Sequence, residues 1–153
     1  MAITYATLDA TYPIEQSPCS TNGAPKHENQ CAIRVGICLA GAGVPLGSFG
    51  GARCWSGHSR DHTLRAEELA TWLINPTRVR LFKDGVFTRT LRPRNATIGA
   101  SSYADRKGIA LFKNFWGTGN QGDHIDLWDG SRARTGSPEY FERSQEVRFW
   151  AMS

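Results

Sequence analysis

The stretch HENQCAIRVGICLAGAG, residues His27–Gly43, predicts a buried helix that begins close to a cysteine. Asn29 is a good N-cap residue, and it places Cys31 in the first helical turn. The residues from Ala32 to Ala40 are apolar almost all round the helix, which is typical of a helix enclosed in a core. The glycines that follow end the helix. We therefore expect a central helix with Cys31 at its N-terminus.

Cys31 is a candidate nucleophile because of this position. The positive end of the helix dipole favours a thiolate, and the unpaired N–H groups of the first turn can hold an oxyanion. Cys38 lies two turns further along the same face and is interpreted as a buried apolar residue. The pattern alone does not separate a catalytic Cys31 from a structural one, because thiol catalysis also requires a base.

The segment GDHIDLWDG, residues 122–130, supplies a candidate base. Its apolar residues predict a strand, and strand alternation sends His124, Asp126 and Trp128 to one face. An imidazole at the start of such a strand can point towards the end of a helix. We therefore expect His124 to meet Cys31 as the general base of a thiol enzyme.

A catalytic imidazole needs an acceptor on its second nitrogen. We assign this role to Asp126, because the strand period alone fixes the face on which it lies. The dipeptide Asp129-Gly130 predicts a two-residue hairpin turn, which would place Trp128 opposite Ser131 and His124 opposite Thr135. Thr135 is therefore the second candidate, as a neutral acceptor, and a Cys–His pair with no third residue is the remaining alternative.

The rest of the chain predicts an α+β domain. Turn-forming residues indicate irregular structure over residues 1–28, and the amphipathic stretch Leu64–Ile74 predicts a second helix. Strands are expected at Arg78–Phe82, Val86–Leu91, Gly108–Phe115, His124–Trp128 and Glu146–Met152. With 153 residues, 40% of them hydrophobic, the chain fits a single domain over residues 1–153.

Composition narrows the possible partners only in part. No run of eighteen apolar residues predicts membrane insertion, and the N-terminus lacks the pattern of a signal peptide. The net charge of +4 suits an anionic partner. The densest basic stretch, Arg78–Arg94, is interpreted as a hairpin with solvated arginines. A module that binds peptidoglycan or another polyanion through this stretch, without catalysis, remains an alternative; we see no nucleic-acid-binding signature.

Two further alternatives involve the remaining cysteines and histidines. Cys54, His58 and His62 are spaced by four residues each, so a metal-dependent hydrolase built on them is an alternative. The segment is rich in glycine and serine, however, which argues against the helix that would align the three side chains. Cys19 and Cys54 lie in predicted loops and could form a disulfide in an oxidising compartment or remain free thiols.

Four motifs and a closing strand occur in an order that resembles one enzyme family. They are NQCAIRVGICLAGAG, CWSGHSRDHTLRAEELATWL, KGIALFKNFW, GDHIDLWDG and the closing EVRFW. Over Tyr12–Trp150 the chain resembles the fourth family of type VI secretion amidase effectors, which are papain-like, NlpC-type cysteine peptidases. The resemblance implies an α+β fold in which a buried helix carrying the nucleophile packs on a mostly antiparallel sheet.

The resemblance also implies a substrate and a setting. The substrate is the peptide stem of peptidoglycan, cut between D-glutamate and meso-diaminopimelate. The enzyme would be made in the cytoplasm without a signal peptide, be injected by a type VI apparatus into the periplasm of a rival bacterium, and be blocked by a cognate immunity protein. No metal or cofactor is implied.

The family motifs assign the catalytic cysteine to Cys31 and the histidine to His124. The third catalytic residue of the family is an acid on the strand after the histidine strand, whereas the predicted hairpin places Thr135 there. The orienting role therefore stays open between Asp126 and Thr135. We also expect three side chains within these motifs to contact the substrate, namely Asn29, Trp55 and Trp128.

Overall fold

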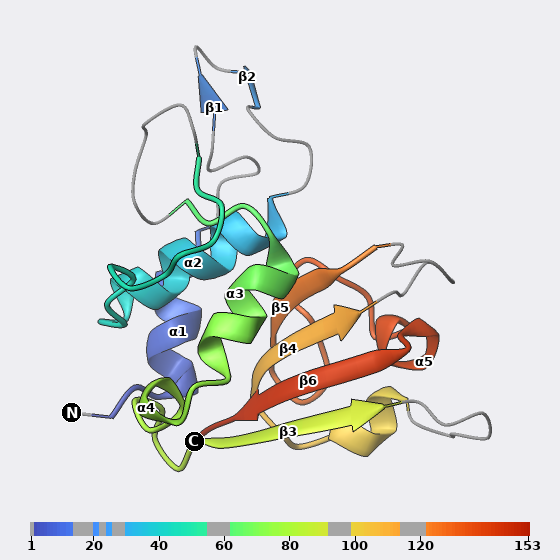
Figure 1. Cartoon of the computed structure of the whole chain (residues 1–153). Helices are drawn as coiled ribbons and strands as arrows, with labels where there is room; N and C mark the ends of the chain where they lie inside the picture. The colour runs from blue at the N-terminus through green and yellow to red at the C-terminus, as the bar shows by residue number, and fades with distance from the viewer. Residues whose placement is uncertain are drawn as a thin grey trace.

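The computed structural model describes residues 2–13, 20–21, 24–25, 30–54, 62–91, 99–113 and 122–153. Its centre is a four-stranded antiparallel sheet in the order β3-β6-β4-β5 (Figure 1). The strands are β3 (Val86–Leu91), β4 (Gly108–Lys113), β5 (His124–Trp128) and β6 (Glu146–Ala151). The helices are α1 (Tyr5–Thr11), α2 (Cys31–Gly41), α3 (Ala66–Leu73), α4 (Pro76–Val79), the 3-10 helix η1 (Ala100–Tyr103) and α5 (Tyr140–Arg143). A separate short pair joins β1 (Ser20–Thr21) to β2 (Ala24–Pro25).

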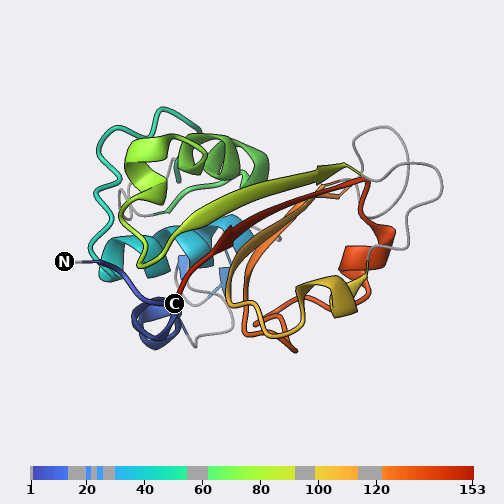
Figure 2. The same ribbon diagram turned by 90° about the horizontal axis from the view of Figure 1, so that it is seen from below.

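Both faces of the sheet are covered, by different elements (Figure 2). On one face, Ile109 and Leu111 of β4 pack in the core that α1, α2 and α3 share. On the other face, Phe112 packs in a smaller core with Tyr103 of η1 and Phe141 of α5. Because β4 lies between two strands and is covered on both faces, its sequence is a continuous apolar run and not an alternating one.

Helix α2 has the burial that its sequence predicts, but Gln30, and not the predicted Asn29, stands at its N-cap. Most of its apolar residues, including Cys31 and Cys38, are buried, and the helix packs against β5. The hydroxyl of Thr63 donates to the carbonyl oxygen of Ala32 at 2.7 Å, and that of Thr11 donates to the carbonyl oxygen of Cys38 at 2.9 Å. Side chains from two other segments thus fix α2 on the sheet.

The expectation of irregular structure over residues 1–28 is wrong for the segment that forms α1. Thr4 caps this helix, since its hydroxyl accepts a hydrogen bond from the backbone N–H of Thr7 at 3.2 Å. Tyr5, Leu8 and Tyr12 recur at helical spacing and are buried against the main core. This three-residue signal is short, and the turn-forming residues that follow it obscured it.

The strand predicted at Arg78–Phe82 is also wrong. Asn75 accepts a hydrogen bond from the backbone N–H of Thr77 at 2.9 Å, and Pro76 occupies the first helical position, so helix α4 forms there. Within the predicted strand, Phe82 forms an isolated β-bridge with Ile3. Strand β3 therefore pairs with β6, and the basic hairpin predicted for Arg78–Arg94 does not form.

The remaining predicted elements are confirmed with shifted ends. The helix expected at Leu64–Ile74 is α3, and the strands expected from Val86 onwards are β3 to β6. The predicted α+β class, with the helix that carries Cys31 packed on an antiparallel sheet, is confirmed. Within the described residues, no helix is both long and apolar enough to cross a membrane.

Candidate functional site

The structure brings together Cys31 and His124, which are 93 residues apart in the sequence. Cys31 opens α2 with only 4% of its surface exposed, and His124 opens β5, against which α2 packs. The thiol of Cys31 and the imidazole of His124 are joined by a side-chain hydrogen bond. The convergence expected from the two sequence motifs is therefore present.

Asp126 completes a hydrogen-bonded line with these two residues. Its carboxylate is fully buried, and its Oδ2 lies 2.9 Å from Nε2 of His124. Because Nε2 faces Asp126, Nδ1 is the ring nitrogen that is left for the thiol. The line runs from Sγ of Cys31 through the imidazole to the buried carboxylate.

Backbone and hydroxyl groups of the next segment hold the carboxylate of Asp126. Its Oδ2 accepts hydrogen bonds from the N–H of Thr135 at 2.8 Å, the hydroxyl of Thr135 at 3.1 Å and the N–H of Gly136 at 2.7 Å. Its Oδ1 accepts from the N–H of Leu127 at 2.8 Å, with the hydroxyl of Tyr12 further away at 3.5 Å. Burial raises the pKa of Asp126, but the hydrogen bonds outweigh burial and hold that pKa below its usual range.

The imidazole of His124 is shifted towards its protonated form. Burial lowers its pKa, but the hydrogen bonds to Asp126 and Cys31, together with the negative charges of these two residues, outweigh burial and raise the pKa from 6.5 to about 9. At neutral pH, His124 is therefore a cation between two groups that can each carry a negative charge.

Aromatic rings confine the imidazole. The ring of Phe112 stacks on it at a centroid distance of 6.2 Å, and the ring of Tyr140 meets it edge-on at 5.3 Å. Phe112 comes from the neighbouring strand β4, directly across from His124, and Tyr140 opens α5. Residues of β4 and α5 thus fix the orientation of the ring.

The comparison with protein families shows the family to which the chain belongs. The sequence matches the family model of Tae4, described as type VI secretion system (T6SS), amidase effector protein 4, over residues 27–150. The chain belongs to this family. It is therefore an enzyme that acts on peptidoglycan, a toxin delivered to target bacteria. Family membership thus favours an enzyme over the non-catalytic binding module.

Solved structures of the Tae4 family share the fold. In a Tae4–Tai4 effector–immunity complex from Enterobacter cloacae, the matched chain is 22% identical, with a TM-score of 0.55 over 82% of this chain and 75% of the matched one. In such a complex from Salmonella Typhimurium, it is 19% identical, with a TM-score of 0.56 over 82% and 74%. No curated protein matches the sequence significantly.

The hairpin register predicted from Asp129-Gly130 is wrong. The turn is two residues longer, because Oδ1 of Asp129 accepts from the N–H groups of Ser131 at 2.8 Å and Arg132 at 2.6 Å. Trp128 is consequently bridged to Ala133 and not to Ser131. The longer turn brings Thr135 beside Asp126, to which it donates two hydrogen bonds, and not opposite His124.

The predicted substrate contact of Trp128 is also wrong. Only 1% of this residue is exposed, because its ring packs edge-on against Phe141 at 4.7 Å and its Nε1–H donates to the carbonyl oxygen of Tyr103 at 3.0 Å. Trp128 is a core residue. Asn29 and Trp55, the other two predicted contacts, lie outside the described residues.

One residue of the hypothetical metal site and one of the hypothetical disulfide lie outside the described residues. Cys54 and His62 lie on facing segments, where the N–H of Cys54 donates to the carbonyl oxygen of His62 at 2.8 Å, but His58 is not among the described residues. The part of the chain that the structure describes holds no group of three histidine, cysteine or acidic residues suited to a metal ion. Cys19 is likewise not described, so its bridge to Cys54 stays a prediction.

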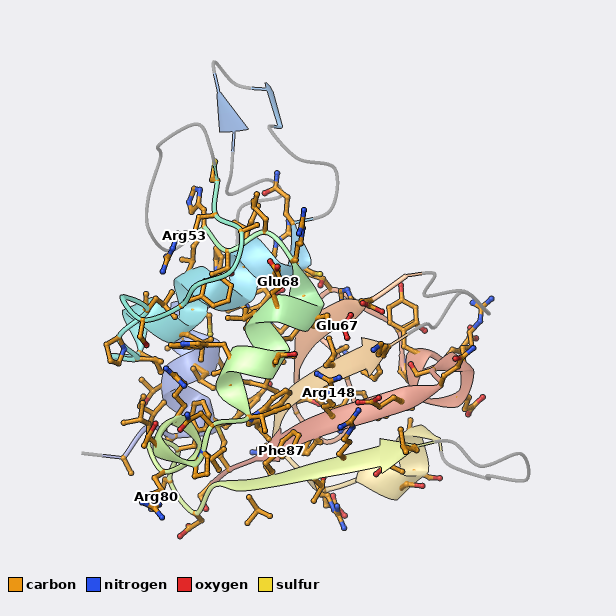
Figure 3. All side chains as sticks on the ribbon, viewed as in Figure 1. Arg53, Glu67, Glu68, Arg80, Phe87 and Arg148 are labelled. Carbon is orange, nitrogen blue, oxygen red and sulfur yellow. The ribbon has the colours of Figure 1, made fainter. Side chains whose placement is uncertain are left out.

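A groove adjoins the residue before His124. Asp123 lines a groove of about 790 Å³, whose walls also include Phe49 and the α3 residues Glu67, Glu68 and Trp72. Figure 3 shows Glu67 and Glu68 on the first turns of α3. Sequence reasoning missed this feature, because the groove depends on how α3 lies against the loop before it and not on any motif.

Proposed function

We propose that the chain is a cysteine amidase that cleaves the bond between D-glutamate and meso-diaminopimelate in the peptidoglycan stem. Cys31, His124 and Asp126 are its catalytic residues. The observation that carries this proposal is the continuous hydrogen-bonded line from the thiol through the imidazole to a fully buried carboxylate. This order of groups is what acyl transfer by a thiol requires.

In the first half of the reaction, Sγ of Cys31 attacks the carbonyl carbon of the scissile amide. His124, whose pKa of about 9 leaves both ring nitrogens protonated at neutral pH, stabilises the thiolate through Nδ1–H. Backbone N–H groups at the start of α2 are placed to hold the oxyanion that forms. His124 then gives its Nδ1 proton to the leaving amine of diaminopimelate, the C–N bond breaks, and a thioester to Cys31 remains.

In the second half, water hydrolyses the thioester. Neutral His124 now accepts a proton from the water, whose oxygen attacks the acyl carbon. The C–S bond breaks, the thiolate of Cys31 returns and the γ-carboxyl group of D-glutamate is released. Asp126 stays ionised throughout, fixes the direction of Nε2–H and stabilises each imidazolium that forms.

The setting proposed for this reaction follows from the family. We infer that the enzyme acts in the periplasm of the target bacterium, where the peptidoglycan stem is accessible, and that residues 1–153 form one catalytic domain. Solved relatives are complexes of an effector with its immunity protein. We therefore propose that a cognate immunity protein binds this chain and blocks it.

Digestion of purified sacculi, with the fragments identified by mass, tests this function. Cys31→Ala should fold and release essentially no fragments, because the covalent route is lost. Cys38→Ala in the same helix is the matched control and should retain turnover per folded molecule, since Cys38 is buried away from the imidazole and donates to the carbonyl oxygen of Leu8. Lysis by Cys31→Ala at the wild-type rate would overturn the proposal.

A second comparison separates the thiol enzyme from a metal enzyme. His124→Ala should abolish turnover, whereas His62→Ala, which removes a buried histidine from the other candidate group, should retain most of it per folded molecule. A chelator should leave the wild type active. A hydrolase built on Cys54, His58 and His62 would give the reverse pattern.

A further inference from the structure

We propose that Gly136 is a positioning residue of this amidase, which holds the orienting carboxylate through its backbone N–H and leaves the space that the catalytic imidazole occupies. The inference rests on the proposed catalytic function. Gly136 belongs to none of the sequence motifs that indicate the active site. It reaches the site because the turn after β5 is longer than its sequence signal predicts.

The backbone N–H of Gly136 holds the carboxylate of Asp126. It donates to Oδ2 of Asp126 at 2.7 Å, the same oxygen that lies 2.9 Å from Nε2 of His124. The N–H of Thr135 donates to this oxygen as well, at 2.8 Å. Backbone donors cannot rotate away as side chains can, so together they fix Oδ2 at the position from which it orients the imidazole.

Gly136 also leaves room for the imidazole of His124, because it has no side chain. A Cβ atom at position 136 would lie 2.9 Å from Nε2 of His124, 3.0 Å from its Cδ2 and 3.0 Å from Cε2 of Tyr140. These contacts are shorter than van der Waals distance. The Cβ atom would press on the ring nitrogen that bonds Asp126, and Phe112 and Tyr140 confine the ring on other sides.

Backbone strain does not explain the glycine. The backbone of Gly136 does not have the positive φ found at Gly122 and Gly130 in the same region, so alanine can adopt its conformation. Gly136→Ala therefore tests the contact with the imidazole and not the freedom of the backbone. Displacement of a catalytic group by about 1 Å can cost a hundredfold in rate.

The test compares Gly136→Ala with Gly47→Ala, a matched control because a Cβ atom at position 47 has no neighbour within 4 Å. Turnover on sacculi should fall about tenfold to a hundredfold for Gly136→Ala and stay unchanged for Gly47→Ala. The pKa of His124, followed by NMR of labelled histidine, should drop in Gly136→Ala from about 9 towards 6.5, because the bond to Asp126 is disturbed.

A folded Gly136→Ala protein with normal turnover and an unchanged His124 titration would overturn the inference. If that variant does not fold, the wild type still provides a test. Its Gly136 amide resonance should move when His124 titrates near pH 9, and an amide insensitive to that titration would contradict the inference. Full activity of Cys31→Ala, in contrast, would overturn the proposed function itself, so the two failures are distinguishable.

Discussion

At the scale of single residues, the protonation of His124 links the site to stability. Its pKa in the folded protein is about 9, above the value near 6.5 expected in the unfolded chain. A raised pKa stabilises the fold fully below pH 6.5, and this contribution is lost as the pH rises through 9.

We therefore expect the free energy of unfolding of the wild type to fall between pH 6.5 and pH 9, relative to that of His124→Ala. Urea unfolding of both proteins across this range measures the difference. A constant difference between the two proteins would mean that the partners of His124 do not favour its protonated form.

The carboxylate of Asp126 should be needed for normal turnover. Asp126→Ala should lower turnover about a hundredfold or more, because the imidazole loses the acceptor that orients it and stabilises its charge. Cys31 should remain open to alkylation, as judged by the mass of its labelled peptide. A soluble, folded Asp126→Ala protein with near-normal turnover would leave a Cys–His pair without a third residue.

The meeting of the three proposed catalytic residues was predictable from the sequence, whereas the groups that hold Asp126 were not. Cys31 and His124 stand at the beginnings of strongly patterned elements, and the strand period alone fixed the face of Asp126. Thr135 and Gly136 depend on the length of one turn, where the hydrogen bonds of Asp129 outweigh the usual preference for a two-residue loop. The dipeptide Asp-Gly is compatible with both the shorter and the longer turn, so the sequence pattern did not decide between the two registers.

At the scale of elements, the apolar pattern decides which helices and strands the sequence predicts and which it misses. Helices α2 and α3 and strands β3 to β6 have clear apolar patterns, either periodic or continuous, so their existence was predictable. Helices α1 and α4 span only seven and four residues, too few to show a period, and their capping residues Thr4 and Asn75 were the signals available.

Helix α2 should be sensitive to loss of apolar volume, because it is buried in the main core. Leu39 is fully buried between α2 and its neighbours, so Leu39→Ala should lower the free energy of unfolding by about 2–5 kcal/mol. Leu91 at the end of β3 is 62% exposed, and Leu91→Ala should change the free energy of unfolding by less than about 1 kcal/mol. Equal losses for the two variants, measured by urea unfolding, would contradict the placement of α2 in the core.

At the scale of the whole molecule, the two ends of the chain close the fold together. The backbone N–H of Tyr5 donates to the carbonyl oxygen of Ser153 at 2.8 Å, and the N–H of Ser153 donates to that of Lys83 at 2.9 Å. Ile3 exchanges backbone hydrogen bonds of 2.7 Å with Leu81 and Lys83. Helix α1 then continues from this junction to support α2 through Thr11, so the N-terminal segment connects the edge of the sheet to the helix that carries Cys31.

The whole fold places Cys31, the proposed covalent nucleophile, at the N-terminus of a buried helix. The most direct measurement mixes the enzyme with a peptidoglycan-derived muropeptide, quenches the reaction with acid and maps any adduct by mass. We expect a transient mass increase on Cys31 that equals the acyl part ending in D-glutamate, with none in Cys31→Ala. Fragments released at the wild-type rate by Cys31→Ala, with no adduct on Cys31 in the wild type, would contradict it.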